Sequence, residues 1–141
     1  MKMQFACFLI GVCLIGCTPS QPAAKKTTTA QPHEHKTVTS LPAAMKQLST
    51  HVETIAKAFS EKKPDDAHDA LHDIGYLLES IPELAKDMSD EKKSAVMKSV
   101  DELKENFDAL DETLHGGPET PYSKVEERIT AAMAGLRTAI E

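Results

Sequence analysis

The sequence predicts an all-α fold: an antiparallel up-down-up-down four-helix bundle that follows a disordered tether. From about residue 41 to residue 141, apolar residues recur at alternating intervals of three and four, which places them on one face of a helix. The same region has no alternating β-branched stretch and no Asn-Gly or Asp-Gly hairpin turn. Its proline, glycine and capping residues divide it into four segments with short connections, and short connections favour antiparallel neighbours.

The first expected helix covers about residues 42–60. Pro42 suits its first turn, where a backbone N–H has no helical partner in any case. The run Lys62-Lys63-Pro64 is expected to end this helix and to begin the next. The apolar face of the first helix consists of Met45, Leu48, Val52, Ile55 and Phe59.

The second expected helix covers about residues 64–88 and contains a proline. Pro82 removes a backbone donor, and Ser80-Ile81-Pro82-Glu83 has the pattern of a capping box at which a new helix could begin. The apolar positions nevertheless stay in phase on both sides of Pro82, so we expect one helix that is kinked near it. These positions are Ala67, Leu71, Ile74, Leu78, Ile81, Ala85 and Met88.

The third and fourth expected helices cover about residues 90–115 and 120–140. Ser89 or Asp90 can cap the third helix, and Gly116-Gly117-Pro118 ends it. Thr120 followed by Pro121 is expected to open the fourth helix as cap and first position. Each helix has one apolar face that it cannot bury alone, so the four should pack together. These faces contain Val96, Val100, Leu103, Phe107, Leu110 and Leu114 in the third helix, and Tyr122, Val125, Ile129, Ala132, Leu136 and Ala139 in the fourth.

The N-terminal segment has the features of an export signal. Lys2 precedes an apolar run of twelve residues, Phe5 to Gly16, which is shorter than the about 20 residues that a membrane-spanning helix needs. Leu14-Ile15-Gly16-Cys17 closes this run and resembles the lipobox of bacterial lipoproteins. The resemblance covers residues 1–17 only. It implies that residues 1–16 are a signal peptide and that Cys17 carries lipid, including palmitate. A signal peptide without lipid, cut elsewhere, is the alternative.

The resemblance also implies where the protein is located. The residue after Cys17 is Thr18 and not aspartate, which by the sorting rule of such lipoproteins favours the outer membrane, facing the periplasm. Cys7 and Cys13 would be removed with the signal peptide, so no disulfide could form. Residues 17–40 are expected to be the lipidated cysteine and a disordered tether rich in threonine and proline. As a flexible coil, this tether would span about 25–30 Å.

The net charge of the chain and its lack of common catalytic motifs limit the classes of function that the sequence favours. The formal net charge is −6, and removing residues 1–16 takes away only Lys2, which leaves 15 basic against 22 acidic residues, or −7. This sign and the exported location both argue against nucleic acid as a partner. The chain has no Gly-rich phosphate loop, no Gly-x-Ser-x-Gly and no His-Glu-x-x-His. We therefore expect a non-enzymatic binding or structural domain of about residues 41–141, whose partners are the membrane, through lipid at Cys17, and another exported protein.

The histidines suggest metal binding as an alternative function. His68 and His72 are four residues apart, so they share a helix face at a spacing that lets two imidazoles bind one metal ion. In an antiparallel bundle His115 lies at the same end, and His51 lies about as deep as His72. These four residues are candidate ligands for copper or zinc, with Asp108 and Asp111 at similar depth. Ordinary solvated or boundary histidines explain the pattern as simply. By position His72 and His115 face solvent, His68 lies at the edge of the apolar face, and His51 is the most buried.

A haem carrier is a third alternative. The expected architecture is similar to that of the periplasmic four-helix bundles cytochrome b562 and cytochrome c′. The sequence has no Cys-x-x-Cys-His, so covalent haem is excluded. Non-covalent haem would need axial ligands in the core, and although Met45 lies on an apolar face, the fourth helix has no histidine. The likeness is therefore architectural only, and the sequence disfavours haem as a cofactor.

Overall fold

A computed structural model describes residues 38–141 of the chain. The lipobox, Cys17 and most of the expected tether lie outside these residues. The described part forms helices α1 (Leu41–Ser60), α2 (His68–Leu84), α3 (Asp90–Leu114) and α4 (Tyr122–Ile140), with a 3₁₀ turn, η1 (Pro64–Ala67), before α2. It contains no strand. The predicted all-α fold is therefore confirmed.

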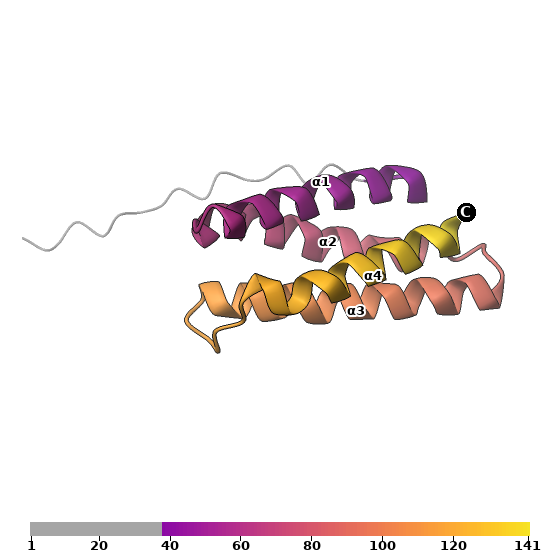
Figure 1. The fold of residues 1–141 in the computed structure, drawn as a ribbon. Helices are drawn as coiled ribbons and strands as arrows, with labels where there is room; N and C mark the ends of the chain where they lie inside the picture. Colours follow the sequence, from indigo (N-terminus) through magenta and orange to yellow (C-terminus); the bar gives the residue numbers. More distant parts are fainter. Residues whose placement is uncertain (1–37) are drawn as a thin grey trace, which may run out of the picture. The chain divides into compact units, whose positions relative to one another are not determined.

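The four helices form a closed ring of neighbours. α1 packs against α2, α2 against α3, α3 against α4, and α4 returns to α1, so that α1 and α3 lie on a diagonal. Consecutive helices run in opposite directions, as Figure 1 shows. One end of the bundle thus gathers the end of α1, η1 with the start of α2, the end of α3 and the start of α4. The predicted up-down-up-down order is the observed one.

The core lies along the axis of the bundle and contains the predicted apolar faces. Val52, Phe59, Met88, Leu114 and Tyr122 are the exceptions, because they are only partly buried against the core. Each helix contributes side chains that are almost fully buried, so all four depend on one another for burial. The largest of these are Leu48, Ile55, Ile74, Leu78, Ile81, Val96, Leu103, Leu110, Ile129 and Leu136.

The second helix differs from the expected kinked helix over residues 64–88 in the type of its first turn and in its end. It begins as the 3₁₀ turn η1, and the α-helix ends at Leu84, two residues after Pro82. From Ala85 to Met88 the chain continues in tight turns, in which Lys86 N–H donates to the Glu83 carbonyl and Met88 N–H to the Ala85 carbonyl. A proline within a helix removes one backbone donor and crowds the preceding turn, which favours an early end. The Ser80 hydroxyl donates to the Leu77 carbonyl.

The caps of the other helices agree with the sequence in part. Ser89 caps α3, because its side chain accepts a hydrogen bond from the Lys92 N–H. At the start of α4, however, Pro121 occupies the cap position and Thr120 caps nothing. The Thr120 N–H instead donates to the Thr113 hydroxyl oxygen at 2.9 Å, which joins the α3–α4 connection to the last turn of α3. The expected cap at Thr120 is therefore wrong.

Two helical glycines provide a test of how tightly the helices pack. A Cβ atom added at Gly135 in α4 would lie 2.9 Å from the hydroxyl oxygen of buried Ser99 in α3, whereas one added at Gly75 in α2 meets nothing within 4 Å. Alanine has a higher helix propensity than glycine, so we expect Gly75→Ala to stabilise the domain by about 0.5–1 kcal/mol. Gly135→Ala should gain less, because Ser99 must move. Urea denaturation of the two variants measures this difference, and equal gains would contradict the close approach of α3 and α4.

Among residues 38–141, no helix combines the length and the apolar character that crossing a membrane requires.

Candidate metal centre

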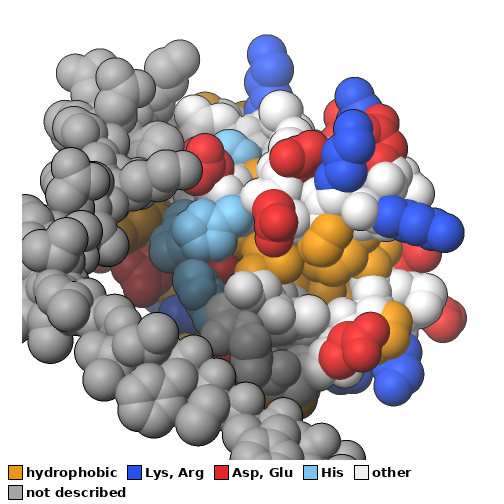
Figure 2. Space-filling model, turned by 90° about the vertical axis from the view of Figure 1, so that its left-hand side faces the viewer, with side chains coloured by type: hydrophobic (Ala, Val, Ile, Leu, Met, Phe, Trp, Pro, Cys, Tyr) orange, Lys and Arg blue, Asp and Glu red, His pale blue; other side chains and the backbone are white. Residues whose placement is uncertain are grey.

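Three of the four candidate histidines meet at one end of the bundle. His68 is the first residue of α2, His72 lies one turn further along, and His115 directly follows α3. The ring centroids are 4.5 Å apart for His68 and His72, 5.2 Å for His68 and His115, and 6.3 Å for His72 and His115. Histidine side chains reach the surface at this end, which faces the viewer in Figure 2. The antiparallel packing of α2 and α3 brings their start and end together.

The fourth candidate, His51, lies outside this group. It is half-buried in the middle of α1. The group that could hold a metal ion consists of His68, His72, Asp111 and His115. His115 and Asp111 belong to the end of α3, which lies on the diagonal from α1 in the ring of helices. The expectation for His51 rested on its depth along the bundle axis. Depth alone does not show whether a residue lies on a neighbouring helix or on the diagonal one.

The nitrogen and oxygen atoms of the group are close together. The Nε2 atoms of His68 and His72 are 3.3 Å apart. One ligand atom from each of the four residues can be chosen so that all lie within 4.8 Å of one another. Tetrahedral zinc with Zn–N distances of about 2.0–2.1 Å separates its ligand atoms by about 3.3–3.4 Å. The pair of His68 and His72 therefore already has this separation, and the Asp111–His115 pair, at 3.5 Å, is close to it. Rotation of the exposed His72 and His115 side chains can adjust the other separations.

Asp111 contributes a carboxylate to the group, and the sequence had placed this residue at a depth similar to that of the histidines. Its Oδ2 atom lies 3.5 Å from Nε2 of His115, four residues further along the chain. Its Oδ1 atom is buried and has no hydrogen-bond partner among the described residues. A buried carboxylate oxygen without a partner is unfavourable, and a bound cation would compensate for it. Asp108, the other carboxylate expected at this depth, does not belong to the group.

Asp69 lies beside the group without belonging to it. Its Oδ1 atom is 3.8 Å from Nδ1 of His68, which is too long for a hydrogen bond but within the range of an ion pair. The Nδ1 atom is on the far side of the ring from Nε2, which faces His72. A hydrogen bond from Nδ1 to this carboxylate, which would require the two side chains to move closer, would leave Nε2 free to bind a metal ion.

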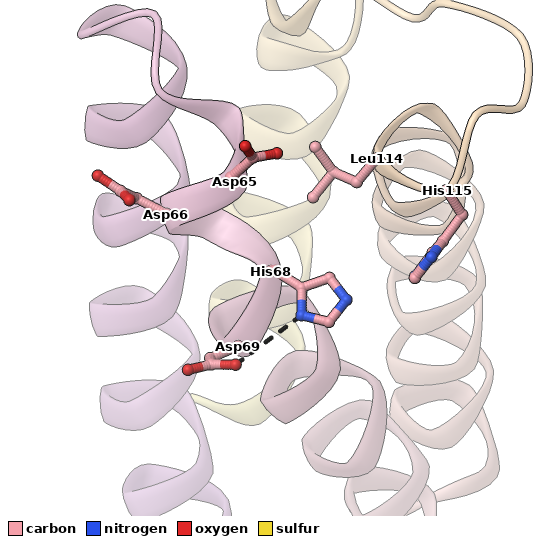
Figure 3. Close-up of a pocket in the computed structure, with 6 residues that line it drawn as sticks. All are labelled: Asp65, Asp66, His68, Asp69, Leu114 and His115. Carbon is pink, nitrogen blue, oxygen red and sulfur yellow. Dashed lines mark ion pairs between the residues drawn. The ribbon is translucent and has the colours of Figure 1, made fainter. Parts of the chain in front are cut away.

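The group opens onto a hollow of about 610 Å³ at the end of the bundle. Figure 3 shows the His68 ring pointing from the start of α2 toward His115, with Leu114 between Asp65 and His115. The lining residues come from η1, the first turn of α2 and the end of α3, and they are Asp65, Asp66, His68, Asp69, Leu114 and His115. A solvent ion can therefore reach two of the histidines through an open space.

A second hollow, of about 600 Å³, lies between the end of α1 and the start of α4. Phe59 stacks on Tyr122 there, with ring centroids 5.4 Å apart. Burial raises the pKa of the Tyr122 hydroxyl above its ordinary value, and the Glu126 carboxylate adds to the rise. Glu126 is the only carboxylate among the residues that line this hollow, and no histidine lines it. It therefore offers no set of metal ligands.

Comparison of the chain with protein-family models, with curated proteins and with solved structures found no match. The comparisons therefore assign this centre to no family.

Proposed function

We propose that this protein is an exported, lipid-anchored lipoprotein whose helical domain binds one transition-metal ion without catalysing a reaction. The proposed ligands are His68, His72 and His115, with Asp111 as the fourth. The observation that carries this proposal is the convergence of three imidazoles and one carboxylate from two helices, with ligand atoms within 4.8 Å of one another. Neutral imidazoles and a carboxylate are ligands that zinc and copper both accept.

We propose zinc ahead of divalent copper as the bound ion. Copper(II) prefers square-planar or tetragonal sites, in which adjacent nitrogen ligands at about 2.0 Å from the metal lie about 2.8 Å apart. The separation of 3.3 Å between the Nε2 atoms of His68 and His72 is closer to the edge of a zinc tetrahedron. The same separation also fits a hydrogen bond between the two rings, with one nitrogen protonated. A metal ion would then take the place of the shared proton.

The lipid anchor is proposed from the sequence alone. Its support is the likeness of Leu14-Ile15-Gly16-Cys17 to a lipobox, together with the polar residues that follow Cys17. Thr18 favours the outer membrane, facing the periplasm, over retention at the inner membrane. Anchoring there would hold the metal-binding domain close to the membrane surface. Docking of another exported protein to the helices is the other function we infer for such a domain.

We expect the full chain, purified in detergent without a histidine tag, to bind one zinc ion. Replacing His68 removes a ligand and breaks the pair with His72, so His68→Ala should weaken zinc binding by about 10- to 100-fold, comparable to the loss of an important residue around a metal site. Isothermal titration calorimetry measures the affinity and the stoichiometry.

The matched control is His51→Ala, which removes a histidine of α1 outside the proposed centre and should leave zinc binding unchanged. His33 and His35 are replaced by alanine in every protein compared, so that zinc bound near the N-terminus does not contribute. If the chain with His68 and His72 intact takes up no zinc at micromolar concentrations, the metal proposal is wrong. An equal loss for His68→Ala and His51→Ala would place the binding elsewhere.

A further inference from the structure

Three carboxylates line the hollow that opens onto the proposed metal ligands. Asp65 and Asp66 belong to η1, and Asp69 lies in the first turn of α2. In Figure 3, Asp65 extends toward Leu114 across the hollow, whereas Asp66 and Asp69 project from the outer side of the same turns. The same hollow is lined by His68 and His115. A cation that approaches it therefore meets Asp65 within the hollow and the charges of Asp66 and Asp69 at its edge, next to two imidazoles.

The lysines that precede Asp65 and Asp66 in the chain form no ion pair with them among the described residues. Lys57 and Lys63 both pair with Glu61, at 3.9 Å and 3.5 Å. Within residues 38–141, neither Asp65 nor Asp66 forms an ion pair with a lysine or arginine. Both aspartates are exposed, and neither lysine nor arginine lines the hollow. Their charge therefore acts on ions in the solvent at the mouth of the hollow.

We propose that this hollow is a route by which the metal ion reaches His68 and His115, and that Asp65 and Asp66 speed its capture. This inference rests on the proposed metal-binding function and adds to it the path and the kinetics of loading. Charges of one sign that line a hollow raise the local concentration of counter-ions and increase association rates. Asp65 and Asp66 lie outside the group of ligand atoms, so they should affect association while leaving dissociation unchanged.

The test is the rate of zinc binding by the full chain in detergent, measured by stopped-flow mixing with a zinc-sensitive dye. We compare the chain with the double variant Asp65→Asn/Asp66→Asn. At low ionic strength the double variant should bind zinc about tenfold more slowly. The difference should shrink at 0.15 M salt, where the Debye length is about 8 Å. The dissociation rate, measured by adding excess chelator, should be the same in both proteins.

The matched control is Asp90→Asn/Glu91→Gln. It changes the net charge equally and also removes two acidic residues from the first turn of a helix. These residues lie at the other end of α3, about 36 Å along the helix from Leu114. The control should bind zinc as fast as the unaltered chain.

Each outcome decides between the two proposals. If the unaltered chain binds no zinc, the metal-binding function itself is wrong. If it binds zinc and both double variants associate at the same rate, the access route is wrong while the metal site stands. If Asp65→Asn/Asp66→Asn instead speeds dissociation, these aspartates hold the bound ion, which also overturns the proposed route. Slower association in that variant alone, relieved by salt, supports it.

Discussion

Replacing Cys17 by serine should release the protein from the membrane completely. In the proposed lipid anchor the Cys17 sulfur would be the attachment point, and serine has no thiol to acylate. Each buried methylene group of an acyl chain contributes about 0.8 kcal/mol to membrane binding, and one chain alone holds a protein only marginally. Several acyl chains on one cysteine would hold the protein at the membrane effectively permanently. Without them we expect the protein to be free of the membrane.

The measurement is fractionation of cells together with incorporation of labelled palmitate. Cys13→Ser is the matched control, because it removes a thiol four residues earlier, within the expected signal peptide. This control should keep both the label and the membrane association. A Cys17→Ser protein that still carries palmitate, or an unaltered chain that carries none, would contradict the lipid anchor.

Truncating Leu103 should destabilise the domain by about 2–5 kcal/mol. Leu103 lies in α3 with 0% of its surface exposed, and it belongs to the core that all four helices share. Leu103→Ala removes buried apolar surface and leaves a cavity, and the cost depends on how far the neighbours can close it. A domain of this size has a total stability of about 5–15 kcal/mol. Residues 38–141 contain no cysteine, so no disulfide can offset the loss.

Denaturation in urea, followed by circular dichroism, measures this effect. Met97→Ala is the control on the same helix, because 42% of the Met97 surface is exposed. We expect the control to change stability by less than about 0.5 kcal/mol. Equal effects of the two substitutions would mean that α3 does not bury Leu103 as the structure describes.

The sequence predicted the helices well because each has a strong, continuous apolar period. Ile55, Ile74, Leu103 and Leu136 were assigned to apolar faces from their spacing alone, and all four are fully or almost fully buried. The helix ends were less predictable, because they depend on single hydrogen bonds. Thr120 donates its N–H to Thr113, seven residues earlier, and no local pattern reveals such a contact.

The candidate site was predictable only in part. The spacing of His68 and His72 placed them on one helix face, and the order of the helices placed His115 at the same end of the bundle. The expectation for His51 used only its depth along the axis, which does not say which helices are neighbours. Among the described residues Asp111 has a buried oxygen without a hydrogen-bond partner, a property that exists only once the helices are packed.

Local patterns by themselves determined the fold class, the number and order of the helices and the prediction of a lipid anchor at Cys17. Such properties depend on residues that are near one another in the chain, where periodicity, proline and glycine act directly. The tertiary structure decided which ligand atoms meet, because the distance between His68 and Asp111 depends on how two helices far apart in the sequence pack. It also decided that Asp65, Asp66 and Asp69 line the hollow beside those ligands.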